Sequence, residues 1–459
     1  QMIALMGFPK VTFIPGYPGI VLGLTQVFIP YMILSIKGVL ENINFNLEDA
    51  AKDLGCGKIQ SFLKVVFPLS TPGMVAGSIF VFLLSFSSFV TPRLLGGGKI
   101  MVVTILIFQQ AMTILNWPFA SAIDALLLCF SLTLVILFNR ITGRVEKMGD
   151  RSGIYREINY ETPFRRGMRK LKNKWYDFRC SFIRYRERPL TGDIRKTSFQ
   201  LPRFLLLALQ ILVLIFIILP LPVVILSSFS ESSRITFPPK AFSLKWYEGL
   251  FIRTEYLRSF LLSLRLALIS VAISLILGTV VALALSRYRF RWSEVLKTIF
   301  LSPLMLPGVI VGLALLRAFA AIGWVATFQG LVVAHILMSS AYVVRMVLSS
   351  LVGFDTSIEE AARDLGASPF YTFLKITLPI IKPGIIVAAL FAFIVSLDET
   401  SLSVFLAGGS TITLPVRIFS MLEHGVEPTV TAVSSLLIAL SLGALFLINK
   451  FIGLEKFKL

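Results

Sequence analysis

The sequence predicts an all-α protein that crosses a membrane many times, and three observations carry this prediction. Of the 459 residues, 56% are hydrophobic and only 15% are charged, whereas about a quarter of the residues of a soluble domain are charged. Apolar runs of about 20 residues, the length that crosses a bilayer as a helix, recur along the chain. One polar stretch between such runs occurs twice, which indicates two homologous units.

Nine apolar stretches are expected to be membrane-spanning helices. They are Gly19–Leu40, Pro72–Pro92, Phe119–Phe138, Phe204–Ser227, Ser259–Leu285, Val295–Ala320, Gly330–Leu351, Gly384–Leu406 and Thr429–Phe451. Basic residues gather at 140–203, at 287–291 and at the C-terminus. Because Lys and Arg collect in cytoplasmic loops, we expect these regions, the C-terminus included, on the cytoplasmic side of the inner (plasma) membrane. The same rule accounts for the net charge of +19 without a nucleic-acid partner.

The duplicated stretch reads EDAAKDLGCGKIQSFLKVVFPLSTPG at Glu48–Gly73 and EEAARDLGASPFYTFLKITLPIIKPG at Glu359–Gly384, 311 residues later. The register continues outward, since GGGKIMVVTILIF aligns with AGGSTITLPVRIF. We therefore predict three parts: a first unit at 1–140, a basic cytoplasmic linker at 141–200 and a second unit at 201–459. The second unit would have six spans. The first would lack about three, so the sequence is expected to be part of a chain with twelve spans.

Each copy of the stretch is expected to form a helix–glycine–helix elbow at the cytoplasmic face, at 48–68 and at 359–379. In the second copy, acids occupy the first turn of a short helix, where the helix dipole favours them. Gly366 suits the left-handed helix end, and Pro369 suits the first turn of the next helix. Pro379 would end that helix or bend the chain into the following span. A plain amphipathic loop is the alternative. The duplication favours instead an exposed acidic helix that a soluble partner binds.

The elbow pattern resembles the EAA signature of binding-protein-dependent ABC importer permeases. The pattern starts with an acid, Ala-Ala, three residues of any type and Gly. Nine residues later it continues with an aliphatic residue, one residue of any type and Leu-Pro. The second copy fits throughout, whereas the first has Asp49 for Glu and Phe67 for Leu. The resemblance implies coupling residues at Glu48, Asp49, Ala50, Ala51, Gly55, Pro68, Glu359, Glu360, Ala361, Ala362, Gly366 and Pro379.

In that family the elbows dock on a cytoplasmic ATPase dimer, whose closure drives alternating access of the membrane pathway. The resemblance thus implies a transport permease and not an enzyme, with ATP-Mg bound by the separate ATPase and no cofactor in this chain. It also implies an extracytoplasmic substrate-binding protein as a partner, beside the lipid bilayer.

Further stretches are similar to the permeases of spermidine/putrescine importers. WYEGLF, LSRYRFRW, GFDTSIEEAARDLGAS and RIFSMLEHGVEPTVTA are similar to the second permease of such a pair, and TPRLLGGGK and NWPFASA to the first. This resemblance implies two permeases in one chain and a small cationic substrate, a polyamine. Importers of ferric iron, thiamine or phosphonate use related permeases and are the alternatives.

Two acids in SLDETSLS, Asp398 and Glu399, are the candidate substrate-pathway residues. If the helix starts at Gly384, Asp398 lies about 21 Å along it, past the middle of a hydrocarbon core about 30 Å thick. A charged side chain there normally faces a cavity or a partner. Carboxylates on the pathway would offset the hydration that a polyamine loses. The alternatives are pairing with a cation of the protein, for example Arg317 or Arg265, and protonation of the acids.

Other polar residues have simpler interpretations. Asp124 and His335 lie in spans, where helix packing or a polar contact between helices is expected rather than ligand binding. GGGK at Gly96–Lys99 is followed by Ile100 and so lacks the phosphate-loop pattern. The basic linker could bind anionic lipid headgroups, but a plain connector is expected. The three cysteines have no paired spacing that predicts a disulfide framework or a zinc site.

Two functions of another class, an ion channel and a membrane-embedded enzyme, fit the sequence less well. A channel needs no pair of ATPase-docking elbows. An enzyme needs a catalytic constellation, and the sequence contains no nucleophile–base pattern. Its two histidines, His335 and His424, are far apart. The sequence therefore favours a transport permease.

Overall fold

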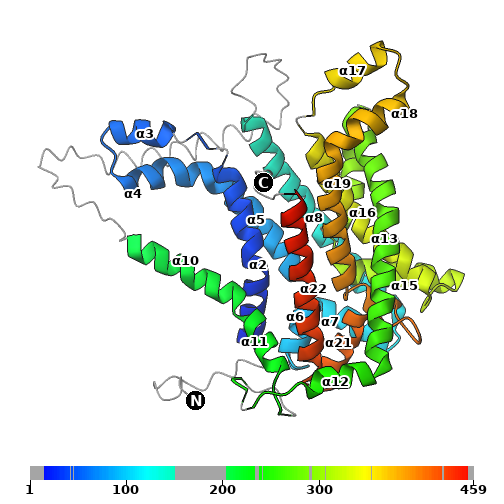
Figure 1. The fold of residues 1–459 in the computed structure, drawn as a ribbon. Helices are drawn as coiled ribbons and strands as arrows, with labels where there is room; N and C mark the ends of the chain where they lie inside the picture. The colour runs from blue at the N-terminus through cyan, green and yellow to red at the C-terminus, as the bar shows by residue number, and fades with distance from the viewer. Residues whose placement is uncertain are drawn as a thin grey trace, which may run out of the picture. The chain divides into compact units, whose positions relative to one another are not determined.

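The structure is a computed structural model (Figure 1). It describes residues 15–41, 43–44, 46–149, 203–232, 237–239, 241–288, 292–304, 306–352, 354–425 and 428–452. Most of the predicted linker at 141–200 lies outside the described residues, and the predicted boundaries of the three parts stay a prediction. By its contacts the chain divides into a large unit, Gln1–Leu34 with Gly77–Phe138 and Gln210–Leu459, and a small unit, Ser35–Ala76 with Asn139–Leu209.

The described residues are helical throughout, apart from turns and one isolated bridge between Ser230 and Phe242. The helices of the first sequence repeat are α2 (Tyr17–Leu40), α3 (Asn46–Asp53), α4 (Lys58–Ser61), η1 (Phe62–Val66), α5 (Phe67–Ser87), α6 (Val90–Leu95), α7 (Val103–Phe108), η2 (Gln109–Thr113) and α8 (Trp117–Gly149). The second repeat begins with α10 (Arg203–Ile218), α11 (Pro220–Ser228), α12 (Lys245–Ile252), α13 (Thr254–Arg287), α14 (Ser293–Leu301), η4 (Ser302–Leu304) and α15 (Gly308–Ile322). It continues with α16 (Phe328–Leu351), α17 (Ser357–Asp364), α18 (Pro369–Thr372), η5 (Phe373–Thr377), α19 (Leu378–Asp398), α20 (Ser403–Leu406), α21 (Leu414–His424) and α22 (Thr429–Ile452).

The two repeats have the same local structure at the predicted offset. Adding 311 to the bounds of α2, α3, α4, η1 and α5 gives the bounds of α16, α17, α18, η5 and α19 without a residue of difference. Even the single π-helical turn recurs, at η1 and η5. The prediction of an all-α fold built from two homologous units is therefore confirmed.

Most of the predicted spans have a counterpart among the described helices. Six helices are long and apolar enough to cross a membrane, and two bent helix pairs raise this number to eight. The ninth predicted span falls on α22, a helix of 24 residues whose stretch Thr429–Gly443 is apolar. The chain thus has the composition and helix lengths of a polytopic membrane protein.

One predicted span, Val295–Ala320, is not a straight helix. It is broken between Leu304 and Gly308, where the two halves meet at 101°. Pro303 and Pro307 stand at the break. Because proline lacks a backbone N–H and disfavours a helical residue before it, the pair interrupts the helix. Average hydropathy cannot detect such a break, since the apolar character continues across it.

Three long helices, α13, α16 and α19, form the core of the second repeat (Figure 1). Small residues line their contacts. A Cβ added at Gly278 of α13 would lie 2.7 Å from Val343 Cγ1 of α16. Ser270 and Ser274 of α13 donate hydrogen bonds to carbonyl oxygens of α16, both at 3.4 Å. Small residues that allow close backbone approach are typical of helix packing in membranes.

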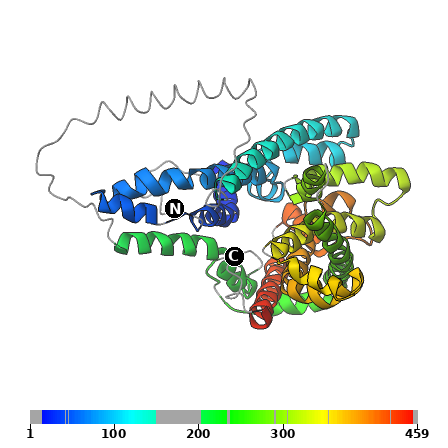
Figure 2. The same ribbon diagram turned by 90° about the horizontal axis from the view of Figure 1, so that it is seen from above.

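The second elbow, α17 and α18, lies across one end of this three-helix bundle. Figure 1 shows it above the ends of α13, α16 and α19, and the view from above in Figure 2 shows the same two gold helices over the bundle. Asp398, the last residue of α19, lies at the other end of that helix. The elbow and the acidic pair are therefore joined by one continuous helix.

The two repeats also contact each other within the large unit. Arg93 of α6 donates a hydrogen bond from Nε to Glu423 Oε1 of α21 at 2.8 Å. Phe89 lies 5.5 Å from Phe419 and Phe108 lies 5.5 Å from Phe405, ring centre to ring centre. An ion pair and an aromatic cluster thus connect α6 and α7 of the first repeat with α20 and α21 of the second.

The orientation of the second repeat can be tested by cysteine labelling. Ser368, in the second elbow, and Ser410, between α20 and α21, are both exposed and are separated by the span α19. In a background without native cysteines, a membrane-impermeant maleimide should label Ser368→Cys only from the cytoplasmic side and Ser410→Cys only from outside. The reverse pattern in intact cells and inverted vesicles would overturn the predicted topology.

Candidate coupling elbows and acidic site

The turn of the second elbow has the hydrogen bonds of a Schellman motif. The amide of Gly366 donates to Arg363 O at 2.9 Å, and the amide of Ala367 donates to Ala362 O at 3.0 Å. Gly366 has a φ of +88°, which residues with a Cβ rarely adopt. These bonds satisfy carbonyls at the end of α17, so the helix stops here as predicted.

The second helix of this elbow starts at a cap and continues into a span. Ser368 Oγ accepts a hydrogen bond from the amide of Tyr371 at 3.3 Å, and Pro369 stands in the first turn of α18. The chain then remains helical from Pro369 to Asp398. Of the two predicted roles of Pro379, ending this helix or bending the chain into the span, the first is therefore wrong. Pro379 lies just after the π-helical turn η5, which interrupts the regular α-helical hydrogen-bond pattern there.

The first elbow, in the small unit, is built in the same way. Gly55 has a φ of +90°. Its amide donates to Lys52 O at 2.9 Å, and the amide of Cys56 donates to Ala51 O at 3.0 Å. Ser61 Oγ donates to Glu48 O at 3.2 Å, which holds α3 against the start of η1. Pro68 again follows the π-helical turn.

Both elbows expose apolar side chains beside their acids. Leu54 is 87% exposed, and Leu365, at the equivalent position, is 90% exposed. Asp49 and Glu360 are exposed as well. Around Leu365 the surface has a shallow hollow, lined by Ala362, Leu365, Gly366, Ala367, Ser368 and Tyr371. Exposed apolar surface with a polar rim is typical of a protein-interaction site.

The first glutamates of the two elbows differ in their contacts. Glu359 is the one buried residue described in α17, and it accepts a hydrogen bond from Arg287 Nη2 at 2.7 Å. Glu48 is partly exposed and pairs with Lys52, one turn along its own helix, at 2.8 Å. Hydrogen bonds to Glu48 and Asp49 raise the pKa of the Lys52 ammonium. Arg287 was not predicted as a site residue, because it lies 72 positions before Glu359.

Asp398 and Glu399 lie at the end of a helix and not inside it. The prediction that they lie within a span running to Leu406 is wrong, because α19 ends at Asp398 and Glu399 is its C-cap. Glu399 Oε1 accepts a hydrogen bond from the amide of Leu402 at 2.8 Å, which stabilises the turn before α20. Asp398 is exposed. Gly308, at the start of α15, approaches Glu399, since its Cβ would lie 3.8 Å from Glu399 Oε1.

The alternative partners of these acids are engaged elsewhere. Arg265 lies over the ring of Phe328, 5.0 Å from its centre, and Arg317 lies 6.0 Å from the ring centre of Trp117. Neither arginine pairs with Asp398 or Glu399 in the part of the chain that the structure describes. The hypothesis that the acids pair with them is therefore wrong.

The acidic pair thus stands at the electronegative end of α19. The C-terminus of a helix carries a partial negative charge that favours cations. Two carboxylates at this position add to that charge, and an added positive charge would relieve it. The arrangement suits the binding of a cation.

The other two polar span residues behave differently from each other. His335 Nδ1 lies 2.8 Å from Ser396 Oγ of α19, and its Nε2 lies 3.0 Å from Ser403 Oγ of α20. The predicted polar contact between helices is therefore confirmed for His335. Asp124 is buried in α8, but its Oδ1 has no hydrogen-bond partner among the described residues. It therefore fits the predicted helix packing and not the polar contact.

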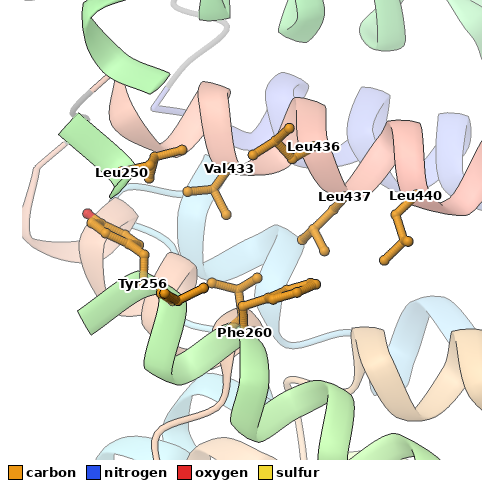
Figure 3. A pocket seen from close by; sticks show the side chains of 9 residues that line it. Leu250, Tyr256, Phe260, Val433, Leu436, Leu437 and Leu440 are labelled. Atoms are coloured by element: carbon orange, nitrogen blue, oxygen red, sulfur yellow. The ribbon is translucent and has the colours of Figure 1, made fainter. Parts of the chain in front are cut away.

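A second hollow, between α12–α13 and α22, has a different character. Figure 3 shows side chains of both segments facing each other across it, Tyr256 and Phe260 among them. Its lining is Leu250, Tyr256, Leu257, Phe260, Leu414, Val433, Leu436, Leu437 and Leu440. None of these side chains carries a charge, so this hollow is apolar and lacks the carboxylates of the acidic pair.

Comparison with known proteins places these features in a family. Residues 2–147 and 274–452 match the family described as binding-protein-dependent transport system inner membrane component. The chain is 35% identical over 229 residues to the spermidine/putrescine transport system permease protein PotC of Haemophilus influenzae, covering 50% of this chain and 89% of that protein. To the putrescine transport system permease protein PotI of Escherichia coli it is 38% identical over 237 residues, covering 50% of this chain and 84% of PotI.

A third relative is similar along both repeats. The ferric transport system permease protein FbpB of Actinobacillus pleuropneumoniae is 22% identical over 452 residues, which covers 97% of this chain and 60% of that protein. The two matched segments of the family and this long match agree with the two-repeat organisation of the chain.

Two nearby glycines of the first elbow, Gly55 and Gly57, should respond differently to substitution by alanine. Gly55 and Gly57 both have open space where a Cβ would be added, but only Gly55 has a left-handed φ. Gly55→Ala should therefore destabilise the end of α3 by about 1–2 kcal/mol, which corresponds to amide exchange about 5–30 times faster. Hydrogen–deuterium exchange of peptides over 46–56 measures this, with Gly57→Ala as the control. Equal effects of the two variants would contradict the argument from backbone conformation.

Proposed function

Because the chain belongs to the family of binding-protein-dependent transport system inner membrane components, we propose that it forms the membrane pathway of an ATP-driven polyamine importer. The observation that carries this proposal is the pair of elbows with one construction, repeated 311 residues apart. A symmetric docking partner needs two equivalent surfaces. An ATPase dimer at the cytoplasmic face has this symmetry.

The elbows would act as the docking surfaces for this dimer. Leu54 and Leu365 stand exposed beside the left-handed glycines, where a partner's groove can bury them. ATP-Mg would be bound by the ATPase, and its closure would move the elbows and switch the pathway between outward and inward access. In this proposal the elbows and the C-terminus would lie in the cytoplasm and the helices in the inner membrane.

Spermidine and putrescine are the substrates we propose. PotC and PotI carry these substrates in their names and are 35–38% identical to this chain over half its length. Asp398 and Glu399 supply two acids at the end of α19 that pair with no basic side chain among the described residues, and polyamines are cations. The substrate would be delivered from outside by a separate binding protein and would pass this acidic pair.

Ferric iron is the second candidate, because the match to FbpB covers 97% of this chain. Carboxylates can also attract a metal cation. The acidic pair itself supplies two acids, and a tightly held ferric ion needs a larger set of oxygen or nitrogen ligands. The residues described around the pair therefore favour the organic cation.

The docking proposal predicts the effect of two substitutions at the elbow surface. Since Leu54 and Leu365 are exposed, replacing both with Ser costs the permease little on its own. A buried leucine contributes about 1.5–3 kcal/mol, and each 1.4 kcal/mol is tenfold in affinity. The ATPase that copurifies with the Leu54→Ser, Leu365→Ser variant should fall at least about tenfold.

Ile252→Ser is the matched control for this experiment, because Ile252 is 79% exposed but lies on α12, outside the elbows. It should leave copurification of the ATPase unchanged. An elbow variant that retains the ATPase at the wild-type level in detergent would contradict the docking role.

The substrate proposal predicts that the charge of the acidic pair is needed for uptake. Asp398→Asn with Glu399→Gln keeps the side-chain size, and the new amide oxygen can still accept the hydrogen bond from Leu402. Cells with this variant should import radiolabelled spermidine and putrescine at least about tenfold more slowly, since a lost contact of 1.4 kcal/mol or more has this effect. Glu248→Gln, an acid on α12, is the control and should not change uptake.

Two results would contradict the substrate proposal. Normal polyamine uptake at a normal membrane level of the variant would remove the acidic pair from the pathway. Import of radioactive iron and not of polyamines by the wild-type chain, in a strain without its own importers, would assign the ferric substrate.

A further inference from the structure

Glu359 joins the second elbow to two other helices. It is 7% exposed, although it belongs to a helix whose other described residues are more exposed. Its Oε1 accepts one hydrogen bond from Arg287 Nη2 at 2.7 Å and one from Thr377 Oγ1. Arg287 ends α13, and Thr377 ends the π-helical turn before α19. One carboxylate therefore connects α17 with two helices of the three-helix bundle.

Arg287 has a second contact that fixes its position. Its guanidinium lies 4.7 Å from the ring centre of Phe354, in the segment between α16 and α17. Phe354 packs against the buried core of α13, α16 and α19. The side chain of Arg287 is 20% exposed and that of Glu359 is 9% exposed. A charge-assisted hydrogen bond shielded from water in this way is stronger than one at the surface.

The first elbow differs from the second around its equivalent glutamate. The position equivalent to Thr377 is Val66, whose side chain has no hydrogen-bond donor. Glu48 is paired within its own helix, with Lys52. Arg363, at the position equivalent to Lys52, does not pair with Glu359. The two glutamates are therefore held by different partners among the described residues, although their elbows have the same backbone.

We propose that Arg287 is a positioning residue that makes the second elbow and the three-helix bundle move as one body. The Arg287–Glu359–Thr377 contact spans the joint between the short helix α17 and the ends of α13 and α19. With the contact present, a displacement of the elbow displaces both long helices. Without the contact, the elbow can move with the ATPase while the three-helix bundle keeps its position. This inference rests on the proposed function, in which the elbow follows an ATPase.

The test uses a variant in which both charges are removed. Arg287→Gln alone leaves Glu359 buried without its cation, so this variant can fail by misfolding. The double variant Arg287→Gln, Glu359→Gln has no unpaired buried charge, and the amide oxygen introduced at position 359 can still accept from Thr377. The resemblance places Glu359 among the coupling residues, but its side chain is buried against Arg287 and Thr377. It lies off the exposed docking surface around Leu365. Reconstituted with the ATPase and the binding protein in proteoliposomes, the double variant should therefore still bind the ATPase and hydrolyse ATP. The spermidine imported per ATP hydrolysed should fall at least fivefold.

Glu255→Gln with Arg417→Gln is the matched control. It neutralises another Arg–Glu pair, 2.9 Å apart, whose acid lies at the opposite end of α13. Its ratio of import to hydrolysis should stay within about twofold of the wild-type ratio, as for a surface pair. Arg287→Lys keeps the charge but not the planar stacking on Phe354, and its ratio should lie between the double variant and the wild type.

Three outcomes separate this inference from the proposed function. A wild-type ratio in the double variant would overturn the role of Arg287 and leave docking intact. Loss of the bound ATPase in the double variant alone would also overturn it, because the contact would then only shape the docking surface. If the wild-type chain itself binds no ATPase, the proposed function and this inference both fall.

Discussion

The close approach of α13, α16 and α19 is the constraint on which the rest of the second repeat depends. Inside a bilayer, helices gain little from the hydrophobic effect and are held by packing and polar contacts. Gly384 has room only for hydrogen, since its Cβ would lie 1.7 Å from Ser350 Oγ. Gly278 is also tight against Val343. Three backbones held this closely form a firm support for the elbow at one end.

The helix α19 has a functional feature at each end. It follows the second elbow directly, and it ends at Asp398 after 21 residues, a length of about 30 Å. His335 ties the acidic end of this helix to α16 and α20 through Ser396 and Ser403. A rigid helix of this length transmits a displacement without a chain of intermediate steps. In the proposed function, α19 therefore links ATPase movement to the substrate pathway directly.

The sequence predicts those features that depend on residues close together in the chain. The left-handed turns at Gly55 and Gly366 follow from the conformational freedom of glycine, and the repeat was predicted from the spacing alone. The 101° break near Pro307 was missed, because an average over a window measures apolar character and not direction. The end of α19 at Asp398 was missed for the same reason. The ion pair of Arg287 with Glu359 joins residues 72 positions apart, which no local pattern predicts.

The two elbows are alike on their exposed surface, where a partner would dock. They differ on the side that packs against their own helices. Leu54 and Leu365 are similarly exposed, as a symmetric partner requires. Thr377 is replaced by Val66 on the inner side. The candidate pathway differs in the same sense, since Ser87 and Ser88 stand where the second repeat has its two acids. One symmetric ATPase movement would then act on two unequal halves. In the proposed function, the second repeat carries both the acidic pair and the Arg287–Glu359 contact, so the movement of its elbow reaches the half that holds the cation.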